Sequence, residues 1–195
     1  MKTDIHSNMK LDGSITLETT LFFDMDDTLI YTNDANFSAY RDAIRTVTKI
    51  DIAKYLNPSK DRVNRENLLF ILPELTQIEL DKIVILKEKI YPTYLSETKI
   101  NKRVLAILMN YCTSNKTVLV TNSNKSRALL TLQYHNLLSK FSHCFFKEKN
   151  QVDKYQNVFS SMSISPNEVI VFENELIEIN HAIQAGISPS NIHLI

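Results

Sequence analysis

The stretch that decides the fold is Phe22-Phe23-Asp24-Met25-Asp26-Asp27-Thr28-Leu29. An apolar run here leads into three carboxylates and a threonine, and a buried strand that ends abruptly in charge usually ends at a functional site. Asp24 and Asp26 share one face of an extended backbone, so their side chains converge. Carboxylates this close repel each other unless a proton or a cation such as Mg²⁺ compensates them. The alternative for Asp-x-Asp alone is an acidic N-cap cluster that opens a helix.

Length and composition exclude several classes of protein. The 195 residues carry 22 basic and 22 acidic side chains, so no charge excess indicates a nucleic-acid polymer as partner. Cys112 and Cys144 lie in apolar segments without metal-type spacing, as expected of reduced core residues. No stretch approaches the roughly 18 apolar residues of a membrane span, and the N-terminus has no apolar signal core. We therefore expect a cytoplasmic protein that acts on neither membranes nor nucleic acids.

Glycine is scarce, and this excludes two ways of binding phosphate. A P-loop or a dinucleotide fingerprint needs clustered glycines so that the backbone can approach the phosphates. The chain has only Gly13 and Gly186. Any phosphate chemistry must therefore depend on side chains, a metal ion and helix N-termini.

Apolar strands alternate with helices in the second half of the chain. Strands are predicted over 15–23, 117–120, 141–146, 168–172 and 192–195. Helices are predicted through Leu129 and Leu137, over about 153–162, and over 175–185 with Gly186 as C-cap. This alternation predicts an α/β fold with a Rossmann-like parallel sheet covered by helices on both faces. In such a sheet ligands bind beyond the carboxyl ends of the strands, where Asp24 lies.

Only helical patterns occur between residues 34 and 110. The apolar spacing of three and four predicts a helix through Phe37 and Val47, a second helix is expected over 62–71, and a fourth over 104–111. A third begins at the capping box Thr76-Gln77-Ile78-Glu79. We therefore expect a core of residues 1–33 and 111–195 with an inserted α-helical cap of residues 34–110.

An apolar strand followed by Asp-x-Asp-x-Thr-Leu resembles motif one of the haloacid dehalogenase (HAD) superfamily. The resemblance implies that Asp24 is a nucleophile that forms an aspartyl-phosphate and that Asp26 is the general acid and base. It also implies a Mg²⁺ site that includes Asp24 and the backbone carbonyl of Asp26, with Thr28 beside the phosphate. Asp27 stands where many relatives have glycine and receives no catalytic role.

The second strand ends Val118-Leu119-Val120-Thr121-Asn122-Ser123, which resembles motif two of the same superfamily. The resemblance implies that Thr121 hydrogen-bonds the transferring phosphoryl group, with Asn122 and the following helix N-terminus beside it. Taken alone, the segment is more typical of a plain helix N-cap.

Motif three requires one lysine near the start of a helix before the fourth strand. Lys154 fits because the helical pattern begins there, Lys149 is the second choice, and Lys147 is a third. A single lysine is otherwise usually a solvated surface charge.

The fourth strand leads into Glu173-Asn174-Glu175, and the next helix ends Ala185-Gly186-Ile187, which resembles motif four. The resemblance implies that Glu173 and Asn174 contribute to the metal site. Asn174 replaces a common Asp ligand, so its carbonyl oxygen would coordinate Mg²⁺ without a charge, and binding would depend more on Glu173.

Together these motifs indicate a Mg²⁺-dependent phosphatase that hydrolyses a small phosphomonoester through an aspartyl-phosphate. Related dehalogenases and ATPases lack the second Asp of motif one, so the presence of Asp26 favours phosphoester chemistry. The subgroup resembled has a helical cap after motif one, like phosphoglycolate phosphatase and β-phosphoglucomutase. A sugar phosphomutase of this fold, or a catalytically weak scaffold that acts as a binding module, are the alternatives.

The substrate is expected to be a small phosphorylated metabolite. The segment from residue 41 to residue 65 contains seven basic and three acidic residues, an excess of four positive charges. Such an excess can attract a second anionic group on the substrate, although charges like these often only solvate outer helix faces. The basic residues are Arg41, Arg45, Lys49, Lys54, Lys60, Arg62 and Arg65.

Overall fold

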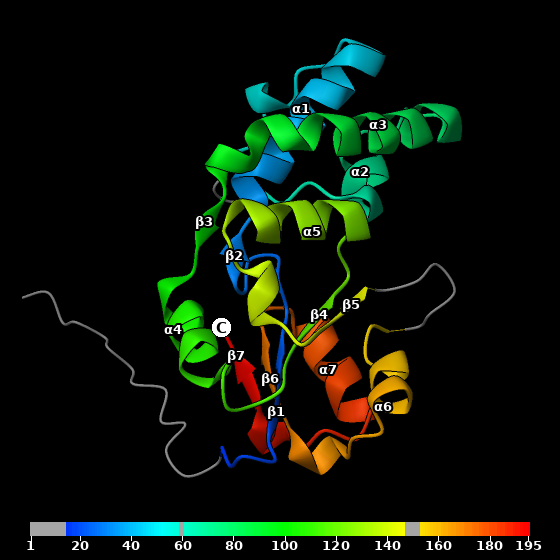
Figure 1. The fold of residues 1–195 in the computed structure, drawn as a ribbon. Coiled ribbons are helices and arrows are strands. Elements are labelled where there is room, and N and C mark those ends of the chain that lie inside the picture. Colours follow the sequence, from blue (N-terminus) through cyan, green and yellow to red (C-terminus); the bar gives the residue numbers. More distant parts are fainter. Residues whose placement is uncertain (1–14, 59–60, 147–152) are drawn as a thin grey trace, which may run out of the picture.

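The computed structural model of the protein describes residues 15–58, 61–146 and 153–195. It confirms the predicted α/β fold, a parallel sheet covered by helices on both faces. Figure 1 shows the sheet in the lower half of the molecule and a group of helices above it. The site described below lies where these two parts meet.

Five parallel strands form the sheet in the order β5-β4-β1-β6-β7. Their bounds are β1 (Thr20–Phe23), β4 (Thr117–Thr121), β5 (His143–Phe146), β6 (Val169–Glu173) and β7 (Ile192–Leu194). The predicted first strand over 15–23 is shorter than expected, because the Thr19 amide donates to the Thr16 carbonyl (3.1 Å) and forms a turn. The central strand β1 pairs with β4 on one side and β6 on the other. The carboxyl ends of these three strands therefore lie next to one another.

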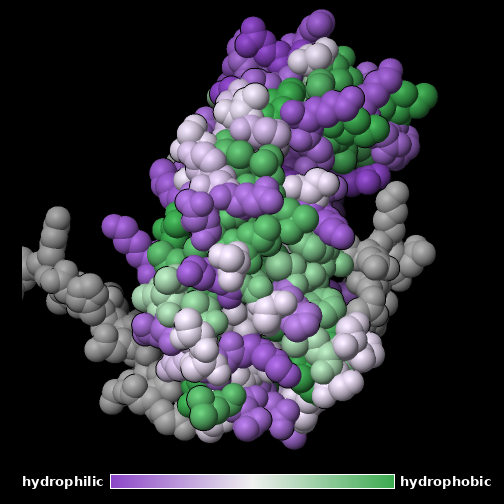
Figure 2. Space-filling model, in the orientation of Figure 1, coloured by the Kyte–Doolittle hydropathy of each residue, from purple (hydrophilic) through white to green (hydrophobic). Residues whose placement is uncertain are grey.

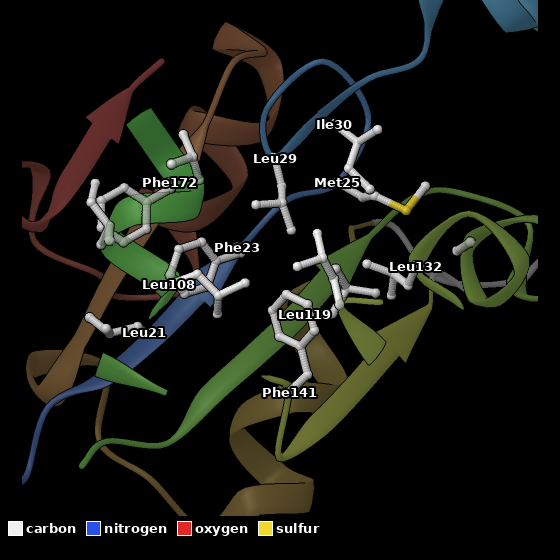
Figure 3. Close-up of a cluster of buried hydrophobic side chains, with 14 of the residues drawn as sticks. Leu21, Phe23, Met25, Leu29, Ile30, Leu108, Leu119, Leu132, Phe141 and Phe172 are labelled. Atoms are coloured by element: carbon white, nitrogen blue, oxygen red, sulfur yellow. The ribbon is translucent and has the colours of Figure 1, made fainter. Parts of the chain in front are cut away.

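Alternate residues of the strands build two apolar layers. On one face, α4 (Lys102–Tyr111) and α5 (Lys125–Tyr134) pack on the sheet, and Figure 3 shows Leu108 and Leu132 pointing toward Phe23 and Leu119. The Phe23 ring stacks on Phe172 with centroids 4.9 Å apart. On the other face, α6 (Gln156–Met162) and α7 (Leu176–Gln184) cover the sheet. Burial on both faces explains why the strands read as continuous apolar runs.

A separate apolar cluster holds the helices above the sheet together. These are α1 (Asn33–Thr48), α2 (Arg65–Ile71) and α3 (Gln77–Ile90), called the helical unit below. The predicted capping box is present, since the Thr76 hydroxyl accepts from the Glu79 amide (3.3 Å). The second helix begins later than the predicted residue 62, because Asn64 caps it in a further capping box.

The expectation that residues 34–110 are only helical is wrong at one place. The two-residue strand β3 (Lys99–Ile100) pairs antiparallel with β2 (Ile30–Tyr31). These two strands form the passage between the sheet and the helical unit, together with the 3₁₀ helix Tyr91–Glu97. After this passage, Val104 and Leu108 of α4 pack in the sheet layer. We therefore propose that the insertion ends near residue 98, earlier than the predicted boundary at 110.

The surface of the helical unit is mixed in character. Figure 2 shows hydrophilic side chains spread over it with hydrophobic ones between them. Phe70 of α2 and Ile78 of α3 are the most exposed of these apolar side chains. Within the described residues, no helix is both long and apolar enough to cross a membrane.

Candidate active site

The carboxyl ends of three neighbouring strands bring the predicted residues to one edge of the sheet. Asp24 follows β1, while Thr121 and Glu173 close β4 and β6. The Asp24 amide donates to the Phe172 carbonyl (3.1 Å), which continues the pairing of β1 with β6 to the last residue before the site. A cavity of about 450 Å³ opens here between the sheet edge and the helical unit. Of the predicted residues, those that line it are Asp24, Asp26, Thr121, Asn122 and Lys154.

Lys154 is the lysine that lies beside the candidate nucleophile. Its ammonium lies 2.7 Å from Asp24 Oδ1 and 2.6 Å from Glu173 Oε2, and its side chain is almost fully buried. Burial acts to lower the pKa of Lys154, but the carboxylates of Asp24 and Glu173 outweigh burial and hold that pKa well above its usual range. The second and third choices, Lys149 and Lys147, lie outside the described residues.

Glu173 is occupied by hydrogen bonds on both carboxylate oxygens. Oε1 accepts from the backbone amides of Asn174 (3.0 Å) and Glu175 (3.1 Å). Oε2 accepts from Lys154 and from the Tyr155 hydroxyl (3.2 Å). These contacts orient Lys154, and a metal contact of Glu173 stays a prediction that would require some of them to break.

Asp26 is held from three sides by residues that the sequence analysis did not single out. The Thr32 hydroxyl donates to its Oδ1 (2.6 Å), the Ser123 hydroxyl donates to Oδ2, and Arg127 Nη1 reaches both oxygens. Burial acts to raise the pKa of Asp26, but Arg127 and the two hydroxyls lower it to about 2.

Thr28 and Asn174 interact with each other. Thr28 is fully buried, and its hydroxyl donates to Asn174 Oδ1 (3.1 Å). Neither residue is part of the cavity lining. In this position Thr28 orients the Asn174 carbonyl, and the contact expected between Thr28 and phosphate stays a prediction.

Thr121 and Asn122 lie on the opposite side of Asp24 from Asn174. The Thr121 hydroxyl is buried and accepts from the Ser123 amide (3.2 Å), while the Asn122 side chain is exposed to the cavity. Both residues precede α5, whose N-terminal amides are capped by Asn124. This turn therefore presents hydroxyl and amide groups to the cavity.

The sheet edge fits a hard cation. Burial raises the pKa of Asp24 to about 8, the nearby charges of Glu173 and Asp26 add to this rise, and Lys154 opposes it, so a cation beside Asp24 would stabilise its ionised form. Asp24 Oδ2 has no hydrogen-bond partner among the described residues. A carboxylate oxygen and the Asn174 carbonyl are donors that Mg²⁺ prefers. The described part of the chain contains no group of three or more His, Cys, Asp or Glu side chains placed to hold a metal, so backbone carbonyls and water would complete the shell.

The helical unit supplies the other wall of the cavity. Of the seven basic residues between 41 and 65, Arg62 and Arg65 line it, and Lys60 lies outside the described residues. Arg62 forms an ion pair with Glu175 across the cavity mouth. Two further cations in the lining, Lys87 of α3 and Arg127 of α5, come from outside that segment.

Solved structures with this architecture show what the chain is similar to. A haloacid dehalogenase-like hydrolase family protein from Streptococcus pneumoniae superposes with a TM-score of 0.70 at 14% identity, over 89% of this chain and 84% of that one. The chain has the fold of the HAD-like hydrolases. This confirms the fold that the motifs imply. No family model matches the chain, and no curated protein matches its sequence.

Two further structures share the HAD-like fold. A Thermotoga maritima protein described as a β-phosphoglucomutase has a TM-score of 0.62 at 23% identity, over 90% of this chain and 84% of that one. The HAD-type hydrolase YfnB of Bacillus subtilis, bound to magnesium, has a TM-score of 0.61 at 18% identity, over 87% and 86%. At these identities the likeness concerns the fold, and the chemistry is argued from the residues of this chain.

Proposed function

We propose that this protein is a Mg²⁺-dependent phosphatase that hydrolyses a small phosphomonoester through an aspartyl-phosphate. The observation that carries the proposal is the arrangement of Asp24: a buried carboxylate at the end of the central strand, bound by Lys154 on one oxygen and open on the other. The helical unit closes the cavity above it and acts as the cap. A cavity of about 450 Å³ matches the size range of sites for small molecules, so the substrate is a small phosphorylated metabolite.

In the first step, Asp24 Oδ2 attacks phosphorus, and the bond from phosphorus to the ester oxygen breaks. Asp26 delivers a proton to the departing alcohol oxygen, and Lys154 and Thr121 stabilise the charge on the phosphoryl oxygens. In the second step, Asp26 removes a proton from water, which attacks the aspartyl-phosphate and releases inorganic phosphate. Arg127 favours the ionised form of Asp26, which is the form that the second step requires. The proton that Asp26 takes from water in that step regenerates the protonated form, from which the first step of the next turnover begins.

Mg²⁺ would be held by the Asp24 carboxylate, the Asp26 backbone carbonyl and the Asn174 amide oxygen, with a contribution from Glu173 only if its present hydrogen bonds rearrange. When bound, it supplies positive charge beside the phosphoryl group. The magnesium-bound Bacillus subtilis structure of the same fold supports this assignment. A cytoplasmic location is part of the proposal and follows from composition.

The test is hydrolysis of an aryl phosphate with and without Mg²⁺, beside Asp24→Asn. We expect turnover that requires both the metal and Asp24. If neither the wild type nor Asp24→Asn hydrolyses the aryl phosphate, but beryllium fluoride with Mg²⁺ raises the melting temperature of the wild type alone, then the site is intact and the enzyme requires a more specific substrate. Absence of both turnover and stabilisation would contradict the proposal.

A phosphomutase is the second candidate, because a described β-phosphoglucomutase shares the fold. The two functions differ in the acceptor of the phosphoryl group, which is a sugar hydroxyl in one case and water in the other. Incubation with a hexose 1-phosphate and analysis by ³¹P NMR separates them. Isomerised hexose phosphate would indicate the mutase, and free phosphate the phosphatase.

A further inference from the structure

Two buried cations meet in the cavity on the side away from Lys154. Lys87 of α3 is 2% exposed, and the Arg127 side chain of α5 is 11% exposed. Both line the same cavity as Asp24. Lysine and arginine are rarely buried to this extent without full compensation by anions.

Aromatic rings hold the two cations in place. The Lys87 ammonium lies 5.2 Å from the Tyr40 ring centroid and 5.1 Å from that of Tyr91. The Arg127 guanidinium lies 5.3 Å from the same Tyr91 ring. Tyr91 therefore fixes both cations on one wall, and α1, α3 and α5 together enclose them.

Asp26 pairs with Arg127 through Nη1, but the other donors of the two cations are only partly satisfied. Glu88 Oε1 is 3.0 Å from the Lys87 ammonium but 3.7 Å from Arg127 Nε, and this buried Nε has no hydrogen-bond partner among the described residues. Burial and the charge of Arg127 lower the pKa of Lys87 to about 8. A buried donor without an acceptor, next to a lysine repelled by its neighbour, is an arrangement that an anion would complete.

We propose that Lys87 and Arg127 bind a second anionic group of the substrate, so that the substrate class is a phosphomonoester carrying a nearby carboxylate or phosphate. This inference rests on the proposed function for the position of the first phosphate beside Asp24. Arg127 also contacts Asp26, which serves the leaving oxygen, so the same guanidinium reaches both groups. The second anion therefore lies only a few bonds from the ester oxygen.

The first test measures binding, without turnover, in Mg²⁺-containing buffer by calorimetry. Phosphonoacetate is compared with 2-hydroxyethylphosphonate, which replaces the carboxylate by a neutral group, and with 1,2-ethylenediphosphonate, which replaces it by a second phosphonate. We expect phosphonoacetate, 1,2-ethylenediphosphonate or both, called the dianionic probes for their two anionic groups, to bind at least about tenfold more tightly than 2-hydroxyethylphosphonate, as for a charged hydrogen bond. Equal affinity for all three would overturn the inference, and this comparison needs only the wild-type protein.

Two matched variants locate the effect. Lys87→Gln should abolish most of the preference for the dianionic probes. Lys89→Gln, an exposed lysine two residues along the same helix, should retain it. A preference that persists unchanged in Lys87→Gln would show that the second anion binds elsewhere.

A second test uses turnover of the phosphate esters of glycolic acid and of ethylene glycol. Equal turnover of both esters, dependent on Asp24, would contradict the inference and leave the phosphatase proposal standing. A binding preference for the dianionic probes without turnover of either ester would support the inference and contradict the phosphatase proposal. The better dianionic probe decides between carboxylate and phosphate as the second group.

Discussion

Arg127 Nη1 lies 3.1 Å from Asp26 Oδ1 and 3.3 Å from Oδ2, so one guanidinium nitrogen spans both oxygens of the candidate general acid and base. Its Nη2 donates to the Ser123 hydroxyl (2.9 Å), which in turn donates to Asp26. Arg127 comes from α5 and Asp26 from the loop after β1, so the contact fixes the Asp26 side chain relative to the sheet. A side chain held this way is preorganised for proton transfer.

The first prediction concerns the pH dependence of turnover. Arg127→Gln removes the charge that lowers the pKa of Asp26 to about 2, so that pKa rises. If Asp26 acts as the base of the second step, the acidic limb of kcat for an aryl phosphate, whose good leaving group makes hydrolysis of the aspartyl-phosphate limiting, should move to higher pH. The exposed Arg45→Gln on α1 serves as the control and should leave the profile in place. An unchanged acidic limb in Arg127→Gln would show that another group controls it.

The second prediction concerns Asp27, which has a left-handed backbone (φ 59°). Its Oδ1 accepts from the amides of Thr32 (2.9 Å) and Asn33 (3.2 Å), so it caps the start of α1 in place of Thr32, whose side chain makes no capping bond. Asp27→Ala loses the cap and keeps an unfavourable φ, and should lower the free energy of unfolding by about 2 kcal/mol. Asp27→Asn retains an acceptor and tolerates this φ, so its free energy of unfolding should change by less than about 0.5 kcal/mol.

Urea unfolding of the two Asp27 variants provides the measurement. An Asp27→Asn protein as unstable as Asp27→Ala would show that the negative charge, and not the hydrogen bonds, stabilises this turn.

Much of the fold followed from local patterns, whereas the contacts within the site did not. The capping box at Thr76 and the apolar strands are signals carried by adjacent residues, and both are present in the structure. The pair β2 and β3 was missed because two residues per strand are too few to show alternation. The Arg127 contact with Asp26 joins residues 101 positions apart, and only the assembled sheet brings them together. The motif predicts Glu173 as a metal ligand, but it does not predict the hydrogen bonds that its carboxylate accepts from the amides of Asn174 and Glu175.

The third prediction tests where the insertion ends. Leu108 of α4 is fully buried in the sheet layer, and Ile83 of α3 is fully buried in the helical unit. Each change to alanine should cost roughly 2 to 5 kcal/mol of the local unfolding free energy. If α4 belongs to the core, Leu108→Ala should weaken hydrogen-exchange protection in β1 and β4, and Ile83→Ala should do so in α1 and α3. Loss of protection only in the helical unit of Leu108→Ala would restore the boundary at 110.

The last prediction concerns the energetic cost of Lys87. Its pKa is lowered from 10.5 to about 8, so between these pH values the unfolded chain binds the proton more tightly than the folded protein. The free energy of unfolding of the wild type should therefore fall as the pH decreases from about 10.5 to 8 and lose no more from this residue below 8. Lys87→Met removes that charge while keeping an unbranched side chain, and should raise the free energy of unfolding at pH 7 by about 1 to 3 kcal/mol.

The comparison is made by urea unfolding at pH 7 and again near pH 10.5, where the difference between Lys87→Met and the wild type should largely vanish. A stabilised variant would mean that the protein carries Lys87 at a cost to its own stability, as expected of a residue that serves a ligand. If Lys87→Met is instead destabilised at both pH values, then packing against Tyr40 and Tyr91 is what this lysine contributes.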